Sequence, residues 1–228
     1  MIVYGSSLSP FVRKVLAYAS EKGIDLEVKS IALGAADPDF REASPFGKMP
    51  GFRDGDFAIS DSTAIIVYLE AIRPEPNLIP TEAKARARTI WFDEYADTIL
   101  SACGGKMFFN RIVAPRFLGM AGDEEAAAKA QCDELPPLLD YLERVIPASG
   151  FLVEDRLTLA DLAVASPFAN FQHLDVAIDP ARYPKVTRYI ETILARPSFK
   201  PMIERETAFL ERTAPAAAAP AAAPATSA

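Results

Sequence analysis

The amino-acid sequence predicts an α/β domain followed by an all-α domain, and three observations support this fold class. Strand and helix signals alternate up to about residue 72, in the order βαβ and then ββα, which is typical of a mixed sheet packed against helices. Residues 73–80 contain three prolines in eight positions and cannot form a helix interior, so they are expected to link two domains. Beyond residue 80 the apolar residues recur only at helical spacing.

The α/β part starts with an apolar strand at residues 2–4 and a short loop. A helix then begins at Pro10, where the missing N–H of proline leaves no donor unpaired. Gly23 is suited to the end of that helix, and residues 26–31 form the second strand candidate. Two further strands, 50–52 and 57–59, flank an Asp-Gly pair that favours a hairpin, and a helix is expected over 62–72.

The second part is expected to contain helices over 81–101, over 123–146, from Thr158 onward and over 184–195. Thr158 and Asp161 have the spacing of a capping box. In the first of these helices, helical spacing predicts one buried stripe of four residues: Ala87, Ile90, Trp91 and Tyr95. The expected units are therefore 1–76, 81–212 and a disordered tail at 213–228, which contains only Ala, Pro, Thr and Ser.

Composition excludes several classes of function. The net charge of −7 argues against a nucleic-acid surface, which normally needs a clustered basic face. No long apolar run and no signal peptide are visible, so we expect no membrane span and a cytoplasmic location. Cys103 and Cys132 are too few and too far apart in the sequence for a disulfide framework, so two free thiols are expected.

The single histidine, His173, rules out a histidine-based metal cluster, and we expect no metal and a helix-end or surface position for this residue. The sequence also has no G-x-S-x-G elbow, no G-x-G-x-x-G fingerprint and no phosphate loop. If the protein is an enzyme, its nucleophile is therefore expected to arrive with a cosubstrate.

Ser9 directly precedes the predicted helix start at Pro10, which makes it the expected N-cap. A hydroxyl at this position lies beside the positive end of the helix dipole. It can cap its own helix, or it can face an anion that binds there. The local pattern leaves both roles open.

Four segments in order carry a resemblance to a known family: Ser9-Pro10-Phe11-Val12, Ser44-Pro45-Phe46-Gly47-Lys48-Met49-Pro50, Ile59-Ser60-Asp61-Ser62-Thr63-Ala64-Ile65 and Leu157-Thr158-Leu159-Ala160-Asp161. The first resembles the Cys-Pro-x-Cys turn of thioredoxins and glutaredoxins, with serine and valine at the two cysteine positions. Together the segments resemble cytosolic glutathione transferases of the serine type over about residues 1–210. This resemblance implies a thioredoxin-like N-terminal domain, a C-terminal helical bundle and a homodimer.

The resemblance also implies a site for glutathione as cosubstrate. Ser9 is expected to be the catalytic hydroxyl, with Ser7 as a weaker alternative. Met49 is expected to pair its backbone with the glutathione cysteine, next to a cis bond at Pro50, although a trans Pro50 that starts an edge strand is the alternative. Asp61 and Ser62 are expected at the γ-glutamyl group, where simple helix capping is also possible. Lys48 is expected at the glycine carboxylate, unless it is only solvated.

The second substrate is expected between the domains, where apolar pockets commonly form. The candidate wall residues are Phe11, Tyr95, Met107, Phe108, Phe109 and Arg111. An aromatic cluster such as residues 107–109 is as readily explained as core.

Three functions remain open from the sequence. The first is conjugation of glutathione to small hydrophobic electrophiles, with peroxide reduction as an added activity. The second is a glutathione-dependent isomerase, dehalogenase or lyase, which would use the same thiolate. The third is a non-catalytic binding module, because a fold alone does not imply a function.

Overall fold

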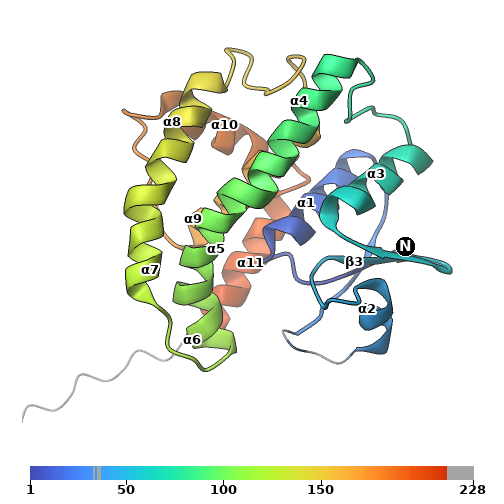
Figure 1. The fold of residues 1–228 in the computed structure, drawn as a ribbon, viewed down its shortest axis with the longest axis horizontal. Coiled ribbons are helices and arrows are strands. Elements are labelled where there is room, and N and C mark those ends of the chain that lie inside the picture. Colours follow the sequence, from blue (N-terminus) through green and yellow to red (C-terminus); the bar gives the residue numbers. More distant parts are fainter. Residues whose placement is uncertain (33, 35–36, 215–228) are drawn as a thin grey trace, which may run out of the picture.

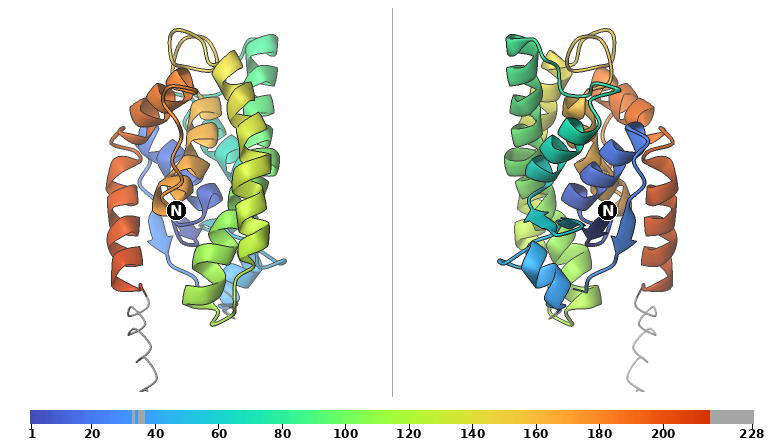
Figure 2. Two further views of the ribbon diagram at one scale, coloured as in Figure 1. Left: turned by 90° about the vertical axis from the view of Figure 1, so that its left-hand side faces the viewer. Right: turned by 90° about the vertical axis from the view of Figure 1, so that its right-hand side faces the viewer.

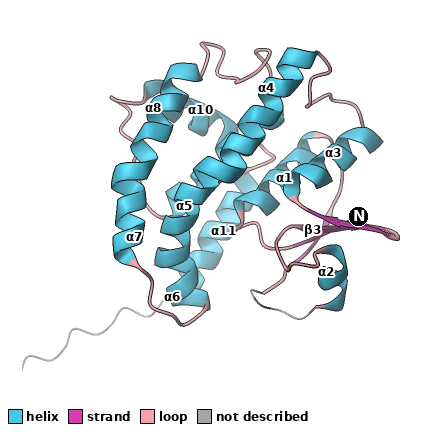
Figure 3. Cartoon of the chain, in the orientation of Figure 1, coloured by secondary structure: helices cyan, strands magenta, loops and turns pink. Residues whose placement is uncertain are grey.

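The computed structural model describes residues 1–32, 34 and 37–214 of the 228-residue chain. A small α/β unit at the N-terminus lies against a larger helical unit (Figure 1). The strands all belong to the first unit, and the elements after residue 80 are helices (Figure 3). The predicted fold class is therefore confirmed.

The sheet has four strands in the order β2-β1-β3-β4. Their bounds are β1 Ile2–Tyr4, β2 Glu27–Lys29, β3 Gly51–Asp54 and β4 Phe57–Ser60. β1 runs parallel to β2 and antiparallel to β3, and β3 and β4 form the predicted antiparallel hairpin. The sheet is therefore mixed, as expected.

Successive side chains of the strands face opposite sides of the sheet. Val3 and Phe52 are fully buried in the main core with helices α1 (Pro10–Glu21) and α3 (Ser62–Ile72). Tyr4 faces the other side, where a smaller apolar cluster includes Phe40 of helix α2 (Pro38–Ala43). The short helix α2 was not predicted, because its six residues carry too few apolar positions to show a helical period.

The helical unit consists of two long helical runs followed by three separate helices (Figure 1). The first run contains α4 (Ala83–Glu94), α5 (Ser101–Phe108) and α6 (Ala114–Phe117), joined by π-helical turns at Tyr95–Leu100 and Phe109–Val113. The second run contains α7 (Glu124–Lys129) and α8 (Leu135–Val145), joined by a π-helical turn at Ala130–Glu134. The last three helices are α9 (Leu159–His173), α10 (Pro184–Leu194) and α11 (Lys200–Arg212).

The buried stripe predicted for the first of these helices is wrong in part. Trp91 is 51% exposed and Ala87 is also exposed, whereas Tyr95 is buried as expected. The buried residues of α4 are instead Thr89, Phe92 and Asp93. An aspartate takes an inward position because a buried lysine of α1 pairs with it, and this rotates the apolar stripe away from Trp91.

Helix α9 lies at the centre of the molecule, with the residues from Leu159 to Phe171 buried. It packs against α1 of the sheet unit and against α4 and α10. The predicted capping box at its N-terminus is confirmed: the Thr158 N–H donates to Asp161 at 2.9 Å. Burial raises the pKa of Asp161 to about 6, although the hydrogen bonds from Leu152 and Thr158 oppose that rise.

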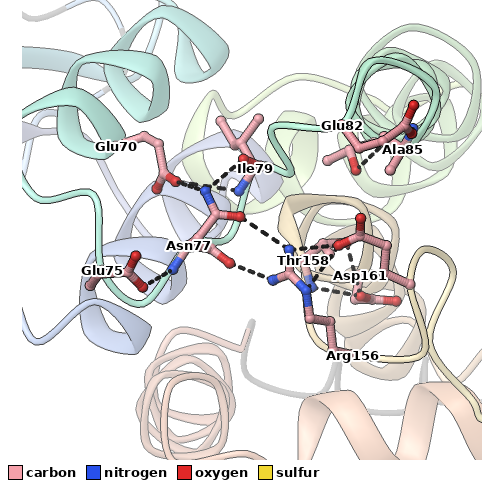
Figure 4. A network of polar contacts seen from close by, with 11 residues as sticks. Glu70, Glu75, Asn77, Ile79, Glu82, Ala85, Arg156, Thr158 and Asp161 are labelled. Atoms are coloured by element: carbon pink, nitrogen blue, oxygen red, sulfur yellow. Dashed lines mark hydrogen bonds and ion pairs between the residues drawn. The ribbon is translucent and has the colours of Figure 1, made fainter.

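Residues 73–82 contain no helix, and polar contacts fix this linker to both units (Figure 4). Asn77 donates to Glu70 of α3 at 3.1 Å, and Arg156 of the helical unit donates to the Asn77 side-chain oxygen at 3.1 Å. The Leu159 N–H donates to the Leu78 carbonyl at 2.9 Å. The linker therefore couples the last helix of the sheet unit to the N-terminus of α9.

Helix α11 ends at Arg212, and the predicted tail lies outside the described residues from 215 onward. In the side views of Figure 2, α11 lies along the face opposite α4, with α1 between them. Within the described part of the chain, no helix has the length and apolar character needed to cross a membrane.

Candidate functional site

Strand register brings three of the predicted segments to one edge of the sheet. β1 ends at Tyr4, which pairs with Gly51, and Gly51 in turn pairs with Ser60. The loop after β1, the Met49-Pro50 pair before β3 and the Asp61-Ser62 pair after β4 are therefore neighbours, although they are far apart in the sequence. Helices α1 and α3 also begin at this edge.

Ser9 is the N-cap of α1, with an extended backbone at φ −76° and ψ 125°. Its side chain makes no capping hydrogen bond. Its N–H donates to the Ser6 carbonyl at 2.9 Å, which makes the loop a tight turn. Of the two roles that the sequence leaves open for this hydroxyl, the geometry disfavours helix capping.

The loop between β1 and α1, residues 5–9, is in close contact with the Met49-Pro50 pair. Gly5 has φ +147°, and a Cβ at this position would lie 2.7 Å from Val12 Cγ2 and 3.3 Å from Met49 Cβ. Only glycine fits there, because a side chain would force the loop and Met49 apart. The Met49-Pro50 bond is cis, as the resemblance implied.

Asp61 caps helix α3, and its carboxylate accepts a hydrogen bond from the Ala64 N–H at 2.9 Å. Its φ of 82° is rare for a residue other than glycine, and such backbone strain is frequent at ligand sites. Ser62 is the first residue of the helix and is 2% exposed. Its hydroxyl donates to Asp97 of the helical unit at 3.1 Å.

The N-termini of α1 and α3 meet at this edge, so two helix dipoles present their positive ends to the same place. Backbone N–H groups in the first turn of a helix bind anions without further charge. The arrangement therefore favours a ligand with more than one negative group. Lys48, the expected partner of a carboxylate, is exposed, and its carbonyl accepts from the Ser44 hydroxyl at 2.7 Å.

A buried ion network lies beneath Ser62, and the sequence did not reveal it. The Lys14 ammonium group, 1% exposed, lies 2.7 Å from both Asp93 Oδ1 and Asp97 Oδ2. Thr63 donates to Asp93 at 2.7 Å. Burial raises the pKa of Asp97 against the lowering effect of Lys14, and Asp93 raises it further.

The apolar candidates separate into two groups. Phe108 is 8% exposed and belongs to a small cluster with Ile112 and Leu210, against which Leu8 of the loop packs. Met107 is fully buried in the main core. Tyr95 is also in that core, and its hydroxyl donates to the Leu138 carbonyl at 3.3 Å.

The other apolar and basic candidates lie nearer the surface. Phe11 is half-buried in the first turn of α1, and Phe109 is 44% exposed. Arg111 forms an ion pair with Glu124 at 2.6 Å and donates to Gln131. Among the expected wall residues of the second-substrate pocket that lie in the helical unit, Phe108 is therefore the one that shares an apolar cluster with Leu8 of the loop.

Comparison with known proteins agrees with this geometry. A family model described as glutathione S-transferase, N-terminal domain, matches residues 3–77, and one described as glutathione S-transferase, C-terminal domain, matches residues 100–197. A glutathione S-transferase of Hyoscyamus muticus is 30% identical over 210 residues, which cover 90% of this chain and 98% of that protein. Glutathione S-transferase 3 of Zea mays is 31% identical over 208 residues, with coverage of 87% and 90%.

Among solved structures, a glutathione S-transferase from Rhodospirillum rubrum F11 superposes with a TM-score of 0.81 at 25% identity. The match covers 88% of this chain and 90% of that one. With both halves of the fold and nearly the whole length of its relatives matched, the chain belongs to the glutathione S-transferase family. It is a glutathione transferase.

Proposed function

We propose that the Ser9 hydroxyl holds bound glutathione as its thiolate, which then attacks small hydrophobic electrophiles. The observation that carries this proposal is the position of Ser9: it precedes the first residue of α1, its side chain makes no capping hydrogen bond, and its loop contacts Met49 through Gly5. Ser9 does not act as a nucleophile in this scheme. It donates a hydrogen bond to the sulfur anion, and the dipole of α1 adds to that stabilisation.

The energetics of this arrangement are sufficient. A free cysteine thiol has a pKa of about 8.5, so only a small fraction is thiolate at neutral pH. Lowering that pKa by about two units requires about 2.7 kcal/mol of preferential stabilisation of the anion. A hydrogen bond to a charged group contributes about 1.5–3 kcal/mol, and a helix N-terminus contributes about 0.3–1 kcal/mol.

The rest of glutathione is assigned to the groups along the same edge. The backbone of Met49 is suited to pair with the cysteine residue of glutathione as one strand pairs with another. The γ-glutamyl carboxylate is assigned to the N–H groups at Ser62, and its ammonium group to Asp61. The glycine carboxylate is assigned to Lys48, whose exposed side chain can reach a solvent-facing ligand.

The electrophile is assigned to the apolar cluster beside the loop, where Leu8 packs against the cluster of Phe108, Ile112 and Leu210. The side chains of this cluster are apolar, which favours an uncharged, hydrophobic substrate. The same thiolate can also reduce hydroperoxides, and we propose this as a secondary activity. Burial raises the pKa of the Cys103 thiol to about 11, which disfavours a protein nucleophile at that position.

We propose further that the protein acts as a homodimer in the cytoplasm. Five large apolar residues are exposed on the loop before β3, on β4, on α3 and on α4: Phe46 at 88%, Phe57, Val67, Ile72 and Trp91. A second copy of the chain would cover such exposed apolar side chains in a symmetric interface. Two free cysteines, Cys103 and Cys132, are in keeping with a reducing compartment.

The proposal is tested by titrating the thiolate absorbance of bound glutathione in the wild type and in Ser9→Ala. The substitution is expected to leave the fold intact, because the lost side chain makes no capping bond. It should raise the thiol pKa toward its free value and reduce conjugation of a chlorodinitrobenzene at neutral pH about tenfold or more. Coincident titration curves would show that the donor is another group, such as Ser7. Glutathione binding without turnover of electrophiles or peroxides would instead identify a binding module.

A further inference from the structure

We propose that helix α9 positions the Ser9 hydroxyl by holding the peptide carbonyls on both sides of it, with Asn170, Ser166 and Arg13 as positioning residues. This inference rests on the proposed role of Ser9. It adds Asn170 and Ser166, from the core of the helical unit, to a site whose proposed glutathione contacts come from the sheet unit.

The two direct contacts come from neighbouring turns of α9. Asn170 Nδ2 donates to the Leu8 carbonyl at 2.9 Å, and Ser166 Oγ donates to the Pro10 carbonyl at 2.7 Å. Leu8 and Pro10 are the two residues that flank Ser9. Asn170 and Ser166 are 4% and 1% exposed, so water does not compete effectively for these carbonyls.

Arg13 fixes the orientation of the Asn170 amide on α9. Its Nη1 donates to the Asn170 side-chain oxygen at 2.8 Å and to the Ser166 carbonyl at 2.8 Å. A guanidinium group has only donors, so the amide of Asn170 must present its oxygen to Arg13. The NH₂ group of Asn170 therefore points toward Leu8, and the amide cannot flip without losing both bonds.

Glu206 of α11 holds Arg13 in turn. The carboxylate accepts from Arg13 Nε at 3.2 Å and from Arg13 Nη2 at 2.7 Å, and His173 Nε2 lies 2.9 Å from the same group. The His173 side chain is 3% exposed, so this residue ends a helix as predicted but is not at the surface. Arg13 has no exposed surface, and a buried charge of this kind is strongly destabilising without its partner.

The loop also influences the ionisation of the same carboxylate. Burial raises the pKa of Glu206, but the charge of Arg13 and hydrogen bonds from His173, Arg13 and the Ser7 hydroxyl together hold it below its usual value. Ser7 lies two residues before Ser9. Leu210, one turn further along α11, packs in the cluster that Leu8 also joins. Polar and apolar contacts thus fasten the loop to α9 and α11 on both sides of Ser9.

The opposite end of α1 offers a matched comparison. Glu21, the last residue of α1, accepts from Arg196 at 2.8 Å and from Ser198 at 2.5 Å. Ser198 is 5% exposed, so its burial is close to that of Asn170. This contact also joins the two units, but it lies at the end of the helix remote from Ser9.

The test compares Asn170→Ala with Ser198→Ala, and Ser166→Ala serves as a second variant with a smaller change. Two quantities are measured in each protein: hydrogen exchange at the backbone amides of residues 6–9 without ligand, and the pKa of the bound glutathione thiol. In Asn170→Ala we expect faster exchange in the loop, a thiol pKa about 0.5–1 unit higher and a kcat at neutral pH about three- to tenfold lower. Ser198→Ala should leave the loop exchange and the thiol pKa at their wild-type values.

Two results would overturn the inference. One is wild-type exchange and wild-type thiol pKa in both Asn170→Ala and Ser166→Ala. The other is an equal rise of the thiol pKa in Ser198→Ala, because the effect would then come from general loosening between the units. Failure of the proposed function is distinguishable, because it appears as an unchanged thiol pKa in Ser9→Ala. The exchange measurement needs no glutathione and still decides whether α9 holds the loop.

Discussion

The two halves of the site are built in different ways. The half proposed for glutathione consists of backbone groups and small polar side chains at one sheet edge, where three segments meet through strand register. The half proposed for the electrophile consists of apolar side chains from a loop and separate helices: Leu8, Phe108, Ile112 and Leu210. Backbone geometry therefore sets the first half, and helix packing sets the second.

Charge distinguishes the two halves as well. Buried ion pairs lie beneath the polar half, at Lys14 with Asp93 and Asp97, and at Arg13 with Glu206. The apolar half depends on dispersion and on the exclusion of water. Changes to a buried charge should therefore have large effects on stability, whereas changes in the apolar cluster should mainly alter substrate preference.

The largest expected effect is on stability, from Lys14→Met. This substitution leaves the buried carboxylates of Asp93 and Asp97 without their cation, and breaking such a pair typically costs about 3–5 kcal/mol. Urea denaturation measures the loss. Lys84→Met, on the exposed face of α4, is the control and should stay within about 0.5 kcal/mol of the wild type. A loss of stability below about 1 kcal/mol in Lys14→Met would show that the buried ion pairs beneath the polar half contribute little to stability.

The next effect is a change of chemistry in Ser9→Cys. A thiol at the start of α1 should have a depressed pKa, as thiols at helix N-termini do. With glutathione disulfide, this thiolate should attack one sulfur, form a mixed disulfide and release one glutathione thiolate. Conjugation should fall about tenfold or more. Mass spectrometry detects the adduct, and Ser20→Cys, near the exposed far end of α1, is the control. Equal adduct formation in both variants would contradict a special position for Ser9.

A smaller effect is expected in the apolar half, from Phe108→Leu. The substitution keeps the residue apolar and should raise the KM for the electrophile about three- to tenfold while leaving the KM for glutathione unchanged. Its neighbour Met107 is fully buried in the main core, so Met107→Leu is the matched control and should leave both values unchanged. If steady-state kinetics showed a higher KM for the electrophile in Met107→Leu and not in Phe108→Leu, the pocket would lie on the other face of α5.

The smallest expected effect is the change with pH in the stability that the ionised Glu206 contributes. Its pKa in the folded protein lies below that of the unfolded chain, which is about 4.3. The ionised carboxylate therefore adds stability above that pH, and the contribution is lost as the pH falls through the folded pKa. The difference in unfolding free energy between the wild type and Glu206→Gln should be constant near neutral pH and should shrink below about pH 4. Glu204→Gln, exposed on the same helix, should show no such trend.

Part of the site could be located from the sequence, because its signals are local. Pro10 after Ser9 and the helix start at Ser62 are short motifs whose backbone conformation depends on the residues themselves. The cis Met49-Pro50 bond was expected only from the family resemblance. The capping box at Thr158 is local in the same sense. The catalytic and binding roles of these residues remain predictions, which the experiments above address.

The sequence by itself determined the order of the four strands, the hairpin and the N-termini of α1, α3, α9 and α10, because hydrophobic period, proline and glycine act over a few residues. It predicted neither α2 nor α11. Only the tertiary structure decided which polar residues are buried. Arg13 and Lys14 lie off the apolar stripe of α1, and by period alone they belong to a solvated face. They are buried because α9 and α4 cover that face, and their partners Glu206, Asp93 and Asp97 are separated from them by about 80 to 190 residues. Trp91 is the converse case, because the pairing of Asp93 with Lys14 turns that side of α4 inward and leaves the indole exposed.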